Sequence, residues 1–162
     1  MKQIVLEQFT ACYDTNTWFV AVRNTLDGLT AAEAAWKPAG ADNSIWEIVS
    51  HLNYYNYAYV ERFKGVDYQY PAADNDATFA AGEATEEGWK AEIAKLDAIL
   101  TEFRDLISGA DEAKFGEPVS ASNQASWATL ISNINAHNAH HGGQIVLLRK
   151  LQSSWDRSKG VG

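Results

Sequence analysis

The sequence predicts an all-α fold, a single bundle of four helices, and three observations lead to that prediction. Four segments repeat apolar residues at intervals of three or four, the spacing that gives a helix one buried face. Two predicted helix starts carry a capping box, at Thr30 with Glu33 and at Ser44 with Glu47. A chain of 162 residues has the size of one ordinary domain, so we expect residues 1–162 to form a single domain.

The ends of the predicted helices are marked by residues that favour helix termination or initiation. Gly28 and Gly65 follow the first and second helices, and Ser126 is a favourable N-cap for the fourth. Residues 66–82 form a connection long enough to cross the bundle, which lets the second and third helices lie parallel. The expected helices cover residues 4–26, 44–64, 85–107 and 126–151, with a short connecting helix after Thr30.

Composition and charge exclude several classes of function. A formal net charge of -8 opposes binding to a phosphate backbone, so we expect no interaction with nucleic acid. The single cysteine, Cys12, cannot form an internal disulfide, which favours a cytoplasmic protein. The N-terminal residues lack the apolar core of a signal peptide, and no segment approaches the roughly 18 apolar residues of a membrane span. We therefore expect neither export nor membrane insertion.

Three of the four histidines fall within five residues of the fourth predicted helix. At about 100° per residue, His137 and His141 lie about 40° apart, close enough for both imidazoles to reach one metal ion. The apolar stripe of this helix turns His141 inward and leaves His140 toward the flank. Inward-facing imidazoles need partners, because an unpaired buried polar group costs about 1–3 kcal/mol. A shared metal is one solution, and hydrogen bonds to the backbone or to tyrosine hydroxyls are the other.

The second predicted helix supplies the remaining histidine, His51, at the edge of its apolar stripe. Three imidazoles with a fourth position left to solvent form the open kind of zinc site that serves catalysis. Nickel, iron or manganese can bind the same ligands. Helical spacing alone does not fix the third ligand, so Cys12, Glu47 and Asp14 remain alternatives to His51.

Two segments of the chain resemble motifs of the DinB-like superfamily. His137-Asn138-Ala139-His140-His141-Gly142-Gly143-Gln144-Ile145 resembles its C-terminal signature, and Ser44-Ile45-Trp46-Glu47-Ile48-Val49-Ser50-His51-Leu52 resembles its helix-two motif. The resemblance extends over nearly the whole chain in helix order and loop placement. It implies an up-down-down-up four-helix bundle and a divalent metal, zinc or nickel first, held by His51, His137 and His141. It also implies a homodimer.

The resemblance further implies a class of chemistry. The superfamily includes transferases and isomerases that use bacillithiol, mycothiol or glutathione, in which the metal activates the thiol. We therefore expect thiol-dependent transferase chemistry on a small molecule. A metal-dependent hydrolase and a metal-stabilised, non-catalytic interaction protein are the alternatives, and no motif in the chain selects among these activities.

Four residues near the expected site have a structural and a functional interpretation. Gln144 faces inward and could orient a ligand, although a structural role is favoured. Glu47 could orient His51, but its capping box already explains it. Tyr55, one turn after His51, is expected to serve packing first and the site second. Arg149 is expected to be a solvated charge near a helix C-terminus.

Overall fold

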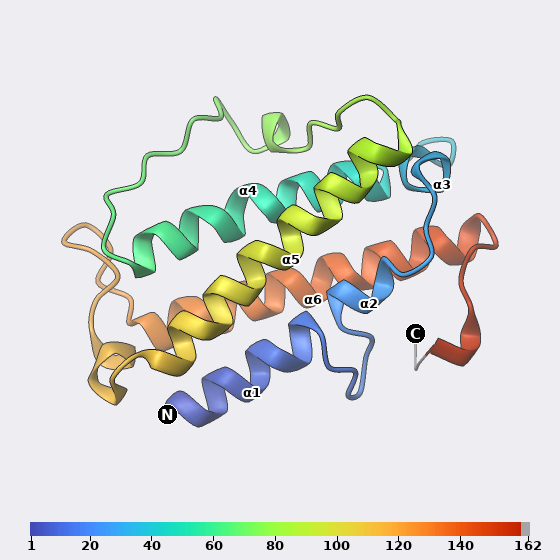
Figure 1. Ribbon diagram of the computed structural model, residues 1–162. Helices are drawn as coiled ribbons and strands as arrows, with labels where there is room; N and C mark the ends of the chain where they lie inside the picture. The colour runs from blue at the N-terminus through green and yellow to red at the C-terminus, as the bar shows by residue number, and fades with distance from the viewer. Residues whose placement is uncertain (160–162) are drawn as a thin grey trace.

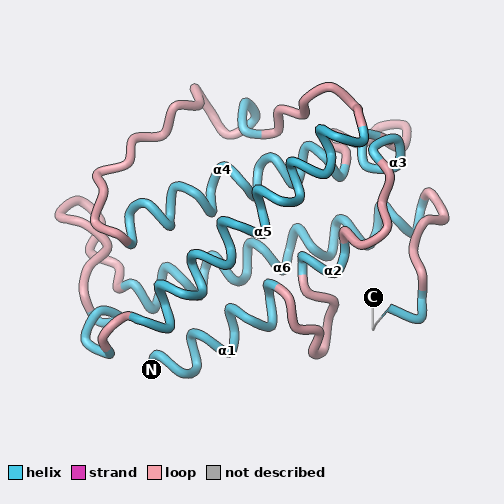
Figure 2. Tube along the Cα trace, in the orientation of Figure 1, coloured by secondary structure: helices cyan, strands magenta, loops and turns pink. Residues whose placement is uncertain are grey.

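The computed structural model describes residues 1–159, whose regular structure is helical (Figure 1, Figure 2). This confirms the predicted all-α fold class. Six α-helices carry the described chain: α1 (Lys2–Tyr13), α2 (Val22–Thr25), α3 (Ala31–Ala35), α4 (Ile45–Phe63), α5 (Glu86–Gly109) and α6 (Trp127–Leu151). Short 3₁₀ helices lie between or after them: η1 (Asp76–Thr78), η2 (Glu112–Gly116) and η3 (Arg157–Lys159).

The four long helices run up, down, down and up, as predicted. Figure 1 shows α1 and α6 running in one direction and α4 and α5 in the other. The connection between α4 and α5 travels back along the whole bundle, which is what allows these two consecutive helices to be parallel. Helix α4 packs on α5 and α6, and α1 packs on α5 and α6, so the four form a closed ring around one core.

Large aromatic side chains fill that core. Trp46, Trp89 and Trp127 are each at most 2% exposed, and Trp46 packs against Trp89 with ring centroids 5.3 Å apart. Burying a side chain of this size removes 150–250 Å² of mostly apolar surface from water, so these contacts contribute strongly to folding. Aromatic residues therefore serve the core at both ends of the bundle.

The helices that carry the histidines begin where the sequence predicts. Ser44 accepts a hydrogen bond from the Glu47 backbone N–H (3.2 Å), and the Glu47 carboxylate accepts from the Ser44 N–H (2.6 Å), completing the capping box. Ser126 accepts from the Thr129 N–H at 3.2 Å and caps α6. Gly65, at φ 90°, ends α4 in the left-handed conformation that only glycine adopts freely. The angular positions of residues along α4 and α6 are thereby fixed.

The prediction of one continuous helix over residues 4–26 is wrong. Helix α1 ends at Tyr13, and α2 begins only at Val22. Between them the Asn16 side-chain oxygen accepts hydrogen bonds from the Ala21 N–H (3.0 Å) and from the Asn24 amide (2.9 Å). A short polar side chain that bonds nearby backbone competes with the helix. Because the helical spacing of apolar residues continues across residues 14–21, the sequence pattern gave no sign that the helix ends at Tyr13.

The expectation that Arg149 is a solvated charge is also wrong. The residue is 3% exposed, and its guanidinium donates to the carbonyl oxygens of Thr25 (2.6 Å), Asp27 (3.0 Å) and Ser154 (2.8 Å). These carbonyls lie at the end of α2 and after α6, where chain ends leave backbone acceptors without helical partners. Arg149 therefore ties three chain segments together inside the fold.

The connection between α4 and α5 is held against α4 by side-chain contacts. The Tyr54 hydroxyl accepts a hydrogen bond from the Ala72 N–H at 2.9 Å, and the Tyr55 hydroxyl donates to the Asn75 side-chain oxygen at 3.2 Å. Further along, Thr78 is buried beside α4. This connection therefore lies against α4.

Among residues 1–159, no helix combines the length and apolar character needed to cross a bilayer.

Candidate metal centre

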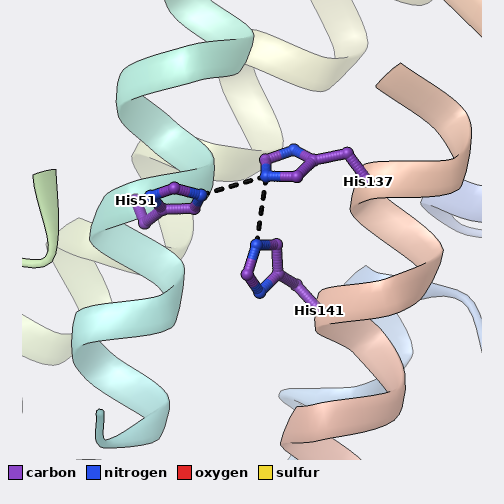
Figure 3. Close-up of side chains that lie close together, drawn as sticks. All are labelled: His51, His137 and His141. Atoms are coloured by element: carbon purple, nitrogen blue, oxygen red, sulfur yellow. Dashed lines mark hydrogen bonds between the residues drawn. The ribbon is translucent and has the colours of Figure 1, made fainter. Parts of the chain in front are cut away.

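Three imidazoles from two helices meet between α4 and α6 (Figure 3). His51 lies on α4 and is 3% exposed, while His137 and His141 lie one turn apart on α6. The Nε2 atom of His137 is 3.0 Å from Nε2 of His51 and 3.0 Å from Nε2 of His141. One nitrogen from each of the three residues lies within 4.8 Å of the others, an arrangement that could hold a metal ion. The structure thus brings together the three histidines singled out in the sequence.

The hydrogen bond from His51 to the α4–α5 connection fixes the position of its ring proton. The Thr78 hydroxyl donates its single proton to the Asn75 carbonyl oxygen at 2.6 Å. Its oxygen lies 2.7 Å from His51 Nδ1 and can therefore only accept there. His51 Nδ1 must carry the proton in the neutral ring, and its Nε2 presents a bare lone pair.

The hydrogen bond between His141 and Gln144 likewise fixes the ring proton of His141. Its Nδ1 lies 2.7 Å from the side-chain oxygen of Gln144, an acceptor without a proton to give. His141 Nδ1 therefore donates, and its Nε2 is also bare. Metal-binding histidines commonly have this arrangement, in which the second ring nitrogen donates to an oxygen and orients the ring.

These two tautomers leave the three Nε2 atoms with too few protons. Neutral His137 carries at most one proton on Nε2, so it can donate to His51 or to His141 but not to both. At least one pair of nitrogen lone pairs then meets at 3.0 Å with no proton between them. A cation placed among the three atoms would remove this conflict, and three neutral imidazole nitrogens are a donor set that zinc and nickel accept.

An additional proton is a poor substitute for that cation. Burial lowers the pKa of His51 to about 3, with further lowering by His141 and His137. Burial likewise lowers the pKa of His137 to about 4, and it lowers the pKa of His141 against the opposing effect of the Gln144 hydrogen bond. All three rings are therefore neutral near pH 7, which is the protonation state that binds metals.

The three histidines are among the ten residues that line a pocket of about 520 Å³. Tyr55 approaches His51 edge-on with ring centroids 4.9 Å apart, and Phe79 stacks on His51 with centroids 4.0 Å apart and planes at 12°. The side of the histidine cluster that faces the pocket is open to a small molecule. The arrangement therefore resembles an open, three-ligand site more than a closed structural one.

The other candidate residues lie outside the three-histidine cluster. His140 is exposed and lines the pocket, with its ring centroid 5.2 Å from that of His141. Glu47 caps α4 and pairs with Lys37 at 2.8 Å, so the capping interpretation holds. Cys12 is buried with a pKa that burial raises to about 11, and Asp14 pairs with Arg104 at 2.7 Å. Neither belongs to the metal cluster found among the described residues.

Sequence reasoning missed Thr78 and Phe79, which both contact His51. They lie 27 and 28 residues further along the chain, in an irregular connection without a periodic pattern. Only the folding of that connection over α4 brings them to the site. The expectation that Gln144 faces inward with a structural role is wrong, because the residue is exposed. Its side-chain oxygen lies 2.7 Å from His141 Nδ1, which supports the orienting role.

Replacing Thr78 by valine is expected to weaken zinc binding by about 10- to 100-fold. Valine keeps the shape but removes the oxygen that fixes the His51 tautomer, so metal binding must also orient the ring. Competition with a chromophoric chelator measures the change. Thr25→Val is the matched control, because Thr25 is buried and donates to the Val22 carbonyl away from the site. Equal zinc affinity of Thr78→Val and wild type would show that this hydrogen bond does not orient a ligand.

A helical bundle with three convergent imidazoles defines a candidate metal-binding bundle protein, and comparison of sequences identifies its family. The sequence model of the DinB superfamily matches residues 17–145, a span that includes α2 to α5 and all three histidines. The chain belongs to the DinB superfamily. Neither a curated protein nor a solved structure gives a significant match.

Proposed function

We propose that this protein is a divalent-metal-dependent enzyme in which His51, His137 and His141 hold one metal ion. Zinc and nickel are the first candidates, and iron and manganese the next. The observation that carries the proposal is the fixed tautomers of His51 and His141, which direct bare nitrogens at His137 in the lining of a pocket. The same residues would otherwise bury an unsatisfied nitrogen pair, at a cost of about 1–3 kcal/mol.

The reaction we propose is transfer of a thiol's sulfur to a small electrophile: a carbon–sulfur bond forms, the leaving group departs from that carbon with its bonding electrons, and the thiol proton is released to solvent. A bound divalent ion would supply Lewis acidity, lowering the pKa of a thiol or water molecule toward neutrality. Thr78 and Gln144 hold the ring orientations, while Tyr55 and Phe79 shield the cluster from bulk water on two sides. Family membership and the sequence resemblance favour a thiol over water. We also propose a cytoplasmic location and a homodimer, and light scattering of the purified protein tests the homodimer.

The test is an activity assay on protein loaded with one equivalent of zinc or nickel. A panel of low-molecular-weight thiols is mixed with an electrophile that changes absorbance when it is attacked by sulfur. We expect turnover with at least one thiol, and its loss in His51→Ala and after chelation. If the loaded protein turns over neither thiols nor hydrolysable esters, while chelation lowers its melting temperature, the metal serves stability and the protein is an interaction module.

Zinc affinity is expected to change little between pH 7.5 and 5.5. An ordinary imidazole, with a pKa near 6.5, loses roughly tenfold in apparent affinity over the unit of pH below its pKa, so three would lose about 1000-fold. In the folded protein the pKa values of His51 and His137 are about 3 and about 4, and that of His141 is also lowered. Few protons therefore compete with the metal at His51 and His137 above pH 5, and only His141 can contribute, so we expect less than about a tenfold loss in total.

Chelator competition, with the chelator calibrated at each pH, measures this dependence. A loss near 1000-fold at pH 5.5 would mean that the three rings titrate as they do in water and are not buried as described. The His140→Ala variant is the control and should show the same pH dependence as the wild type, because His140 is exposed and lies outside the three-histidine cluster.

A further inference from the structure

Two buried asparagines join the helices that carry the three histidines. Asn56 on α4 and Asn138 on α6 are each 1% exposed. We propose that this pair positions His51 relative to His137, because it fixes how far α4 and α6 are shifted along each other, and that it thereby sets the geometry of the metal centre. The inference rests on the proposed function and assigns positioning residues to the same site.

The two side-chain amides bond to each other in both directions. Asn56 Nδ2 donates to Asn138 Oδ1 at 3.0 Å, and Asn138 Nδ2 donates to Asn56 Oδ1 at 3.2 Å. Asn56 Nδ2 also donates to the carbonyl oxygen of Leu52 at 2.8 Å. Hydrogen bonds weaken steeply when their distance or angle leaves the favoured range. A slide of one helix along the other by about 1.5 Å, the rise of one residue, would therefore break both bonds of the pair.

The pair lies close to the histidines on both helices. Asn138 directly follows His137 in the sequence. Asn56 comes five residues after His51, but its amide turns back to the carbonyl of Leu52, the residue that follows His51. The bonded amides are thus within about one helical turn of His51 along α4. A displacement of the two helices at the pair is consequently a displacement of His51 from His137, which face each other across the site (Figure 3).

Apolar contacts do not fix the two helices with the precision that a metal needs. Phe63 on α4 packs edge-on against Trp127 on α6 with ring centroids 4.8 Å apart, but this contact is twelve residues beyond His51. Hydrophobic attraction is non-directional, whereas distances from a metal to its ligands are set within about 0.2 Å. A buried polar pair can often be replaced by apolar residues at little cost in stability. What the asparagines add is therefore a defined relative position.

The test replaces both asparagines by leucine, which has the same number of side-chain heavy atoms and the same branching. In Asn56→Leu with Asn138→Leu no amide is left unpaired, so we expect a urea midpoint close to that of the wild type. Zinc affinity, measured by chelator competition, should fall at least about tenfold, as it does when groups that orient metal ligands are removed. If the leucines overfill the space, Asn56→Val with Asn138→Val, one atom smaller at each position, should give the same loss.

A spectroscopic signature separates positioning of the ligands from a role in stability alone. Cobalt(II) is bound in place of zinc, and its visible absorption, which is strong in a tetrahedral site, should weaken in the double variant. Asn53→Leu is the matched control. Asn53 is also buried on α4, but its amide donates to the carbonyl and carboxylate oxygens of Glu92 on α5, at 3.1 and 2.6 Å. We expect its zinc affinity to stay within about threefold of wild type and its cobalt spectrum to be unchanged.

The outcomes separate the inference from the proposed function. A folded double variant with the zinc affinity and cobalt spectrum of the wild type would overturn the inference alone. An equal loss of affinity in Asn53→Leu would also overturn it, because any loosening of α4 would then have the same effect. Wild-type protein that binds neither zinc nor cobalt would overturn the proposed function and the inference with it.

Discussion

Replacing His137 by alanine is expected to lower zinc affinity by a factor on the order of 100–1000, the largest effect of any single substitution at the site. His137 is the common neighbour of the other two histidines, since its Nε2 lies 3.0 Å from each of their Nε2 atoms. Its removal leaves two ligands on different helices, too few to hold a divalent ion in a tetrahedral site. Chelator competition on the purified variant measures the loss.

The matched control for this substitution is His140→Ala. His140 is on the same helix and lines the same pocket, but it is exposed and not in the three-histidine cluster. We expect its zinc affinity to stay within about threefold of wild type, the context-dependent spread of a residue that does not bind the ion. A His137 variant with wild-type affinity, or a His140 variant that loses as much, would contradict the ligand assignment.

Replacing Arg149 by alanine is expected to destabilise the protein by about 3–5 kcal/mol. The substitution leaves three carbonyl oxygens without their charged donor, that of Thr25 in buried surroundings and those of Asp27 and Ser154 in partly buried ones. It also removes a guanidinium that lies 5.2 Å from the centre of the Trp155 ring. Urea unfolding followed by circular dichroism measures the change in the free energy of unfolding.

Two further variants distinguish the role of this guanidinium from that of charge alone. Arg149→Lys keeps the positive charge but cannot reach three acceptors in different directions, so we expect it to recover less than half of the loss. Lys150→Ala removes a neighbouring exposed cation and should change stability by less than about 0.5 kcal/mol. Equal stabilities of Arg149→Ala and Lys150→Ala would show that the buried hydrogen bonds contribute little.

The long helices could be predicted from the sequence because their determinants are local. The capping boxes at Thr30 and Ser44 form as the sequence suggests, and α4, α5 and α6 begin and end within about two residues of the predicted limits. The parallel arrangement of α4 and α5 followed from the length of the segment between them. Periodicity, caps and connection length together were sufficient for this part of the fold.

Two features depended on contacts that periodicity does not encode. The break after Tyr13 results from the Asn16 side chain bonding to backbone and side-chain groups of the next helix. The burial of Arg149 depends on carbonyls from the ends of α2 and of the chain after α6, more than 120 residues away in the case of Thr25 and Asp27. A charged residue near a helix C-terminus is usually solvated, so no local signal distinguishes this one.

The sequence was sufficient to identify the three histidines and Gln144, which orients His141. It was not sufficient to identify Thr78, which orients His51. His137 and His141 share a helical face, and Gln144 is within the same turn, so these positions follow from helix geometry. Thr78, Phe79 and Asn75 come from the irregular connection above α4. Their positions depend on tertiary folding of that connection, so the tautomer of His51 could not be predicted from the sequence.

We propose that one divalent ion binds among His51, His137 and His141. Elemental analysis of protein purified without a histidine tag and then incubated with zinc or nickel tests it most directly. We expect about one ion per chain in the wild type and in His140→Ala, and a small fraction of one in the alanine variants of the three histidines. Wild-type protein that takes up neither metal, or that holds it equally well without His51, would contradict the claim.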